Sequence, residues 1–104
     1  MKKATVIEMV LFRTNEGVTP EESKNKLISV NEFLIKQEGF ISRKISISDD
    51  REFLDIVFWA DMNLAKAAAN NLMNYPEICE NFDVIDRETM TFKHFEIFND
   101  IQID

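Results

Sequence analysis

Residues 53–60 read FLDIVFWA, and their side chains alternate in character with the period of a β-strand. Successive side chains of a strand point to opposite faces of a sheet, so this segment has one wholly apolar face. Its other face mixes large apolar side chains with a carboxylate. The apolar set is Leu54, Ile56 and Phe58, and the mixed set is Phe53, Asp55, Val57 and Trp59.

Three further segments, residues 5–13, 40–47 and 90–98, repeat this two-faced alternation and predict three more strands. We expect helices to cover the apolar face of the sheet and function to sit on the mixed face. The expected helix-covered set is Ile7, Met9, Leu11, Ile41, Ile45, Ile47, Leu54, Ile56, Phe58, Phe95 and Ile97. The expected helix-free set is Val6, Glu8, Val10, Phe12, Phe40, Ser42, Lys44, Ser46, Phe53, Asp55, Val57, Trp59, Met90, Phe92, His94, Glu96 and Phe98.

Two helices separate the predicted strands. The first is expected from Pro20 to about Gln37, because Thr19 can cap it and Glu22 completes a capping box. The second is expected over about 62–74 behind the N-cap Asp61, and its face of small side chains suits close packing on a sheet.

The predicted order is βαββαβ, the ferredoxin-like arrangement of the α+β class. Right-handed crossovers place both helices on one face of a four-stranded antiparallel sheet. We expect a single domain over residues 1–104, in which 99–104 form a tail that is loose or reaches a partner chain. A short amphipathic turn is expected over 77–82.

Composition narrows the range of partners. The 104 residues carry 12 basic and 19 acidic side chains, for a net charge of −7, which argues against nucleic acid or an anionic membrane surface. No apolar run approaches the roughly 18 residues of a membrane span. The single Cys79 cannot form an internal disulfide, which favours a reducing compartment, so we expect a cytoplasmic protein.

The patch expected on the helix-free face is larger than monomers usually tolerate. It consists of nine large apolar side chains: Val6, Val10, Phe12, Phe53, Val57, Trp59, Met90, Phe92 and Phe98. A second copy of the chain, packed sheet against sheet, is the simplest cover. We therefore expect a homodimer through the sheet face.

Several segments carry a family resemblance: GVTPEE at 17–22, GFISR at 39–43, LDIVFW at 54–59 and TFKHFE at 91–96. Over nearly the whole chain, the sequence resembles the dimeric α+β barrel proteins of the antibiotic-biosynthesis-monooxygenase type. The resemblance implies a ferredoxin-like subunit, a dimer whose two sheets form a barrel, and one pocket per subunit. The superfamily includes cofactor-free monooxygenases, haem-degrading enzymes and lactone isomerases, so the likeness bears on architecture more than on chemistry.

His94, the only histidine, shares the mixed face with Glu8 and Asp55. In a ferredoxin-like sheet the first strand lies between the third and the last, so Glu8 can neighbour both other residues. One hypothesis makes His94 a general base oriented by a carboxylate. The alternative is a structural cluster, since buried charges need partners wherever they occur. Lys44 would pair with one of the carboxylates or with a substrate anion.

The expected pocket walls are Trp59, Phe12, Phe92 and Phe98, where Trp59 either stacks on a flat ligand or simply packs. We expect no cofactor: the helix over 62–74 lacks the histidine that haem-degrading relatives use, and no metal-ligand spacing is present. The leading hypothesis is a cofactor-independent monooxygenase or isomerase acting on a small apolar or aromatic substrate. The alternative is a non-catalytic dimer that binds a small ligand or serves in stress. A cavity of about 300 Å³ or more would favour ligand binding.

Overall fold

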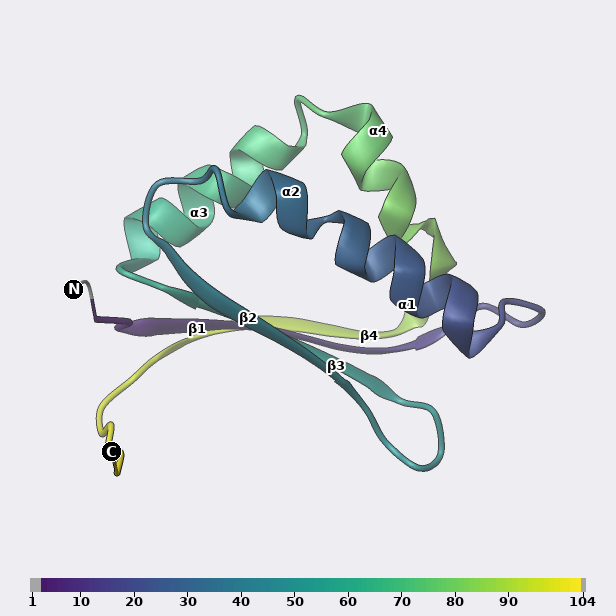
Figure 1. Ribbon diagram of the computed structural model, residues 1–104, viewed down its shortest axis with the longest axis horizontal. Helices are drawn as coiled ribbons and strands as arrows, with labels where there is room; N and C mark the ends of the chain where they lie inside the picture. The colour runs from purple at the N-terminus through teal and green to yellow at the C-terminus, as the bar shows by residue number, and fades with distance from the viewer. Residues whose placement is uncertain (1–2, 104) are drawn as a thin grey trace.

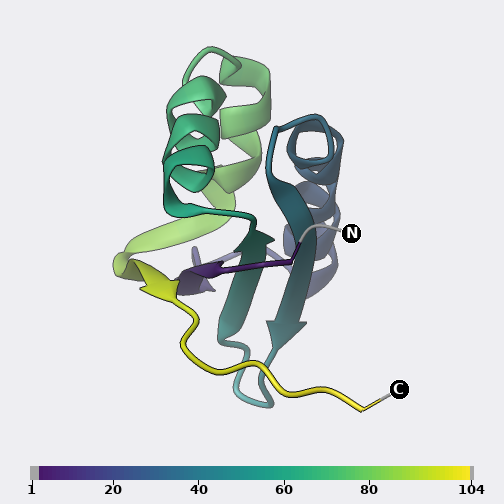
Figure 2. The same cartoon turned by 90° about the vertical axis from the view of Figure 1, so that its left-hand side faces the viewer.

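The computed structural model describes residues 3–103 and has the predicted order of elements (Figure 1). The elements are β1 (Val6–Thr14), α1 (Pro20–Ser29), α2 (Asn31–Leu34), β2 (Phe40–Ile47), β3 (Phe53–Trp59), α3 (Met62–Leu72), α4 (Pro76–Cys79), the 3₁₀ helix η1 (Glu80–Val84) and β4 (Ile85–Glu96). The strands pair antiparallel in the order β2-β3-β1-β4, and all helices lie on one side of the sheet (Figures 1 and 2). The α+β ferredoxin-like fold is thereby confirmed.

Both predicted N-caps form. The Thr19 hydroxyl oxygen accepts a hydrogen bond from the Glu22 N–H at 3.1 Å, and the Asp61 carboxylate accepts one from the Leu64 N–H at 2.8 Å. The prediction of one continuous first helix is wrong, because α1 ends at Ser29 and α2 runs only from Asn31 to Leu34.

The assignment of the two sheet faces was wrong for β1, β3 and β4, whereas Ile45 and Lys44 of β2 lie on the faces predicted for them. Along β3 the side chains that point toward the helices are Phe53, Asp55, Val57 and Trp59, and all four are buried. The wholly apolar alternates on the same strand are only half-buried, on the face that no helix covers. The mixed face can be covered because its ionisable groups pair with one another. Pure hydrophobicity was therefore the wrong criterion for choosing the helix side.

Strand β2 also differs in phase, because a bulge interrupts its pairing with β3 between Phe40 and Ser42. Beyond the bulge, Arg43 and Ile45 join the helix-covered face, as the contact of Arg43 with Asp55 shows. Lys44 lies on the opposite, helix-free face, where its ammonium group is 5.7 Å from the centre of the Phe58 ring. The structure therefore does not bring Lys44 to Glu8 or Asp55.

Two apolar clusters fill the space between sheet and helices. In one, the Phe12 and Phe53 rings stack with centroids 5.4 Å apart, and in the other Trp59 packs edge-on against Phe40. Helix α3 approaches the sheet so closely that a Cβ at Gly39 would lie 2.6 Å from Leu64 Cδ1. Within residues 3–103, none of the helices is long and apolar enough to cross a membrane.

The chain leaves the sheet earlier than predicted. Strand β4 ends at Glu96, and the Ile97 N–H still donates to the Thr5 carbonyl before the chain continues as a tail. Phe98 is fully exposed in this tail, so it is not a pocket wall. The tail extends away from the helices, below the sheet in Figure 1. Asp104 lies outside the described residues.

Candidate functional site

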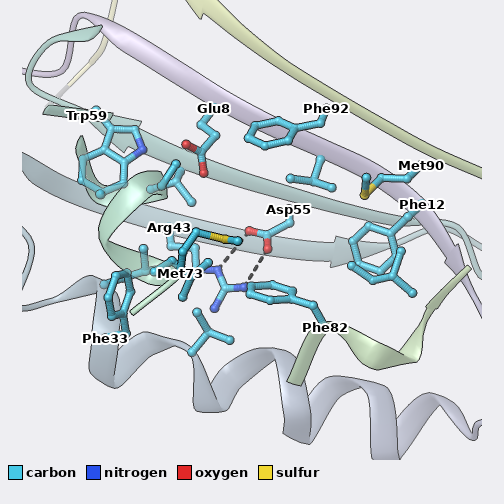
Figure 3. A pocket seen from close by; sticks show the side chains of 18 of the residues that line it. Glu8, Phe12, Phe33, Arg43, Asp55, Trp59, Met73, Phe82, Met90 and Phe92 are labelled. Atoms are coloured by element: carbon cyan, nitrogen blue, oxygen red, sulfur yellow. Dashed lines mark hydrogen bonds and ion pairs between the residues drawn. The ribbon is translucent and has the colours of Figure 1, made fainter. Parts of the chain in front are cut away.

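A cavity of about 290 Å³ lies between the mixed face of the sheet and the helices. Figure 3 shows its wall, which draws on all four strands, α2, α3 and η1. The volume lies just below the roughly 300–1,000 Å³ that is typical of small-molecule sites. The lining residues with polar groups are Glu8, Arg43, Asp55, Trp59 and Arg87, and those with aromatic or sulfur-containing side chains are Phe12, Phe33, Met73, Phe82, Met90 and Phe92.

A buried ion pair crosses the floor of the cavity. Arg43 Nε and Nη2 donate to the two carboxylate oxygens of Asp55 at 3.0 and 2.6 Å, and the two side chains are 4% and 7% exposed. Arg43 Nη1 donates to the Leu27 carbonyl at 2.7 Å and to the Asn31 side-chain oxygen at 2.9 Å. The guanidinium therefore ties the sheet to the junction of α1 and α2 as well as to Asp55.

Glu8 and His94 form a second pair across β1 and β4. These residues lie opposite each other in the strand register, and His94 Nε2 is 3.0 Å from Glu8 Oε1. Burial raises the pKa of Glu8, and the negative charge of Asp55 raises it further, while the hydrogen bond and charge of His94 and the charge of Arg43 act to lower it. Glu8 lines the cavity, whereas His94 lies outside the lining and contacts Glu8. Glu8 is therefore the member of the pair that a ligand in the cavity would meet.

The indole of Trp59 supplies an unused hydrogen-bond donor. The side chain is 1% exposed, and among residues 3–103 its Nε1 finds no hydrogen-bond partner. Figure 3 shows the indole nitrogen and the Glu8 carboxyl group turned toward the same space inside the cavity. Burying an N–H group without a hydrogen-bond partner costs the free energy of removing that group from water. A ligand with an acceptor atom at this point would restore the hydrogen bond, and its binding would therefore be favoured.

Several apolar lining side chains are accessible to solvent and mark the opening of the cavity. Met73 at the end of α3 is 75% exposed, and Met90 and Phe92 on β4 are also exposed. Methionine is flexible and polarizable, so it adapts to ligands of varied outline. These exposed side chains place the solvent-accessible edge of the cavity near the end of α3 and near β4.

The structure brings together most of the residues predicted for the site. Glu8, Asp55, Phe12, Trp59 and Phe92 line the cavity. His94 reaches it only through Glu8, whereas Lys44 and Phe98 lie elsewhere. Whether any of these side chains acts on a ligand stays a prediction.

Arg43 is the buried charged residue of the cavity that the sequence analysis missed. A signal was available, because Arg43 is the one charged residue in the alternating series Ile41, Arg43, Ile45 and Ile47. A charge in such a place indicates a buried partner, and Asp55 on the next strand provides it.

The acidic and imidazole side chains of the site occur in pairs within residues 3–103. No group of three or more His, Cys, Asp or Glu side chains there could hold a metal ion. Glu8 and His94 form a pair, and Asp55 is engaged by Arg43.

Comparison with solved structures shows that the fold is shared with monooxygenases. SnoaB, a cofactor-independent oxygenase from Streptomyces nogalater, superposes with a TM-score of 0.66 at 16% identity, covering 97% of this chain and 98% of its own. A putative antibiotic biosynthesis monooxygenase from Bordetella bronchiseptica gives 0.76 at 9% identity, with 93% and 100% covered. A dimeric ferredoxin-like protein from an uncultured marine organism gives 0.70 at 8% identity, with 99% and 96% covered.

These matches confirm, at the level of the fold, the resemblance to proteins of the antibiotic-biosynthesis-monooxygenase type. No protein-family model matches the sequence, and no curated protein matches it either. At such low identity the comparisons establish architecture, and the chemistry must be argued from the cavity itself.

Proposed function

We propose that the protein is a cofactor-independent monooxygenase that oxidises a small hydroxylated aromatic molecule bound in the cavity. The observation that carries this proposal is the unpartnered Trp59 N–H beside the Glu8 carboxyl group, inside a largely apolar cavity. Such a site favours a flat ligand with one oxygen to accept from Trp59 and one acidic proton to give to Glu8.

Glu8 is the proposed general base. Its raised pKa makes the carboxylate a stronger base than an ordinary glutamate, and His94 at 3.0 Å is placed to exchange the proton with it. Trp59 donates to the substrate oxygen on which negative charge develops when the proton leaves. The same proton transfer to Glu8 without molecular oxygen would catalyse an isomerisation. An isomerase is therefore the variant of this proposal that needs no oxidant.

The deprotonated substrate itself supplies the electrons for oxygen. With a dihydroxynaphthalene, molecular oxygen adds to the ring carbon para to the ionised hydroxyl group and forms a C–O bond and a peroxide. Loss of water from the peroxide breaks the O–O bond and leaves a carbonyl. The balance is one dihydroxynaphthalene and one O₂ giving one hydroxynaphthoquinone and one water. This balance requires no further reductant.

The comparison with SnoaB supports the proposal, since that protein is a cofactor-independent oxygenase with the same fold. The cavity supports it independently, because its walls are apolar and aromatic and so suit an aromatic substrate. Neither line of support specifies the substrate, which is inferred from the chemistry of the two polar groups.

We further propose that the active form is a homodimer joined through the helix-free face. That face carries the half-buried apolar side chains of β1 and β3 together with Phe95, which is 44% exposed. The structural neighbour described as dimeric supports this arrangement. In a symmetric dimer each subunit would cover the same face of the other, which gives the barrel that the family resemblance implies.

Oxygen uptake with a panel of dihydroxynaphthalenes tests the proposed reaction. We expect uptake with equimolar formation of hydroxynaphthoquinone, and a loss of about 10²–10⁴-fold in kcat for Glu8→Gln. Glu88→Gln is the matched control, because Glu88 is an exposed carboxylate on β4 outside the cavity lining, and it should leave the rate unchanged. Turnover unaffected by His94→Ala would remove His94 from the mechanism, and turnover unaffected by Glu8→Gln would refute the proposed base.

A second candidate is a non-catalytic dimer that binds a small ligand or has a stress-related role. It is favoured by one observation: Arg43 with Asp55, and Glu8 with His94, each satisfy one another as structural polar pairs do. Binding of hydroxynaphthoquinone without oxygen uptake from any dihydroxynaphthalene would select this candidate over the monooxygenase.

A further inference from the structure

The Arg43–Asp55 ion pair adjoins Glu8 and takes no part in the reaction described above. Both Asp55 oxygens accept from Arg43, so neither is free to take a proton from a ligand. In the register of β1 and β3, Glu8 lies opposite Val57 and Val10 lies opposite Asp55. Glu8 and Asp55 are therefore diagonal neighbours on the same face, about 7–8 Å apart between backbones.

Among residues 3–103, the charged groups that face Glu8 come from strands. His94 contributes from β4, Asp55 from β3 and Arg43 from β2, while Arg87 of β4 lies in the lining at an exposed position. The helical part of the lining carries no charge. It consists of Val30, Phe33, Leu34, Ala68, Ala69, Leu72, Met73 and Phe82. With so few charges in an apolar surrounding, each one acts on Glu8 with little screening.

We propose that Arg43 and Asp55 are positioning residues that set, with opposite signs, how readily Glu8 gives up its proton. The negative charge of Asp55 favours the protonated form of Glu8, and the positive charge of Arg43 favours the ionised form. For its consequence on turnover this inference rests on the proposed function, but its effect on Glu8 exists whether or not the protein is an enzyme.

The geometry holds these two charges at fixed points. Arg43 is anchored by Asp55 on one side and by the Leu27 carbonyl and the Asn31 side chain on the other, so the guanidinium cannot swing toward Glu8. A ligand therefore meets a Glu8 whose surroundings are already organised, which is the condition for electrostatic control without reorganisation during reaction.

Because Asp55 and Arg43 should shift the Glu8 midpoint in opposite directions, the inference can be distinguished from a purely structural role of the ion pair. The titration of Glu8 is followed by carbon NMR of its carboxyl group, assigned by its absence in Glu8→Gln. We expect Asp55→Asn to lower the pH of the Glu8 midpoint and Arg43→Gln to raise it. Asn31→Ala is the control, since it removes an Arg43 hydrogen bond without changing a charge, and it should leave the midpoint in place.

Shifts of the same sign in the two single variants, or no shift in either, would overturn the inference. If a single variant does not fold, Arg43→Lys and the double variant Arg43→Gln/Asp55→Asn provide the test. Arg43→Lys keeps the charge and should hold the midpoint. The double variant removes two charges of opposite sign, so its midpoint should lie back in the opposite direction from that of whichever single variant folds. A double variant that moves the midpoint further in the same direction as that single variant would also overturn the inference.

The activity readout separates this inference from the proposed function. In an active enzyme, the acidic limb of the kcat/KM profile should move in the same directions as the Glu8 midpoint. Opposite NMR shifts in a protein that consumes no oxygen would keep the inference and reject the monooxygenase. Oxygen uptake by a protein whose Glu8 midpoint does not move in the variants would keep the monooxygenase and reject the inference.

Discussion

Replacing Arg43 by methionine should be among the most destabilising single changes in this protein. The side chains of Arg43 and Asp55 are 4% and 7% exposed, and the substitution leaves a buried carboxylate without its partner. Breaking a buried pair in this way costs about 3–5 kcal/mol. The Leu27 carbonyl and the Asn31 side chain also lose a donor, which places Arg43→Met in the upper part of that range.

Urea unfolding followed by circular dichroism measures this loss, at one fixed protein concentration because dimerisation would contribute to stability. The double variant Arg43→Met/Asp55→Leu is the matched control. It removes both charges and restores apolar packing, so it should recover most of the loss. A loss below about 1 kcal/mol for Arg43→Met would refute the claim that the pair is buried and coupled.

Three further predictions concern the protonation, the packing and the assembly of the protein. Burial raises the pKa of Glu8 above its ordinary value of 4.5, so the folded state favours the protonated carboxyl group. The contribution of Glu8 to the free energy of unfolding should be complete below pH 4.5 and lost as the pH rises through the raised pKa of Glu8. Urea midpoints measured across pH should no longer show this pH dependence in Glu8→Gln. Gly39→Ala should destabilise by at least about 1–2 kcal/mol in thermal unfolding, because Gly39 has φ +86° and the added Cβ meets Leu64; an unchanged Tm would contradict that close approach. Ile56→Asp, on the helix-free face, should shift sedimentation toward a single-chain species at micromolar concentration, whereas a wild-type monomer would contradict the dimer.

The sequence was sufficient to predict the elements of the fold. Alternation with period two, the Thr19 and Asp61 caps and the break at Gly39 are local signals, and each appears in the structure at or near the predicted place. The side of the sheet that the helices cover is not a local property. It depends on whether polar groups on that side can satisfy one another, as Glu8 with His94 and Asp55 with Arg43 do.

The site was predicted in part for the same reason. Glu8, Asp55 and Trp59 share a face by simple alternation, so their gathering could be expected from the sequence. A bulge near Ile41 shifts the phase of β2, and a single-residue shift moves every later side chain to the other face. That shift exchanges Lys44 for Arg43, and its sign in the sequence is the charge of Arg43 in the alternating series Ile41, Arg43, Ile45 and Ile47.

Trp59 is the only tryptophan, so its indole N–H gives one distinct resonance in a proton–nitrogen NMR spectrum. Titration with juglone, a hydroxynaphthoquinone, tests most directly whether the cavity is a ligand site. The account predicts that this resonance moves downfield and saturates as the quinone oxygen accepts the indole hydrogen bond. An indole resonance that stays unmoved at saturating juglone would contradict the account.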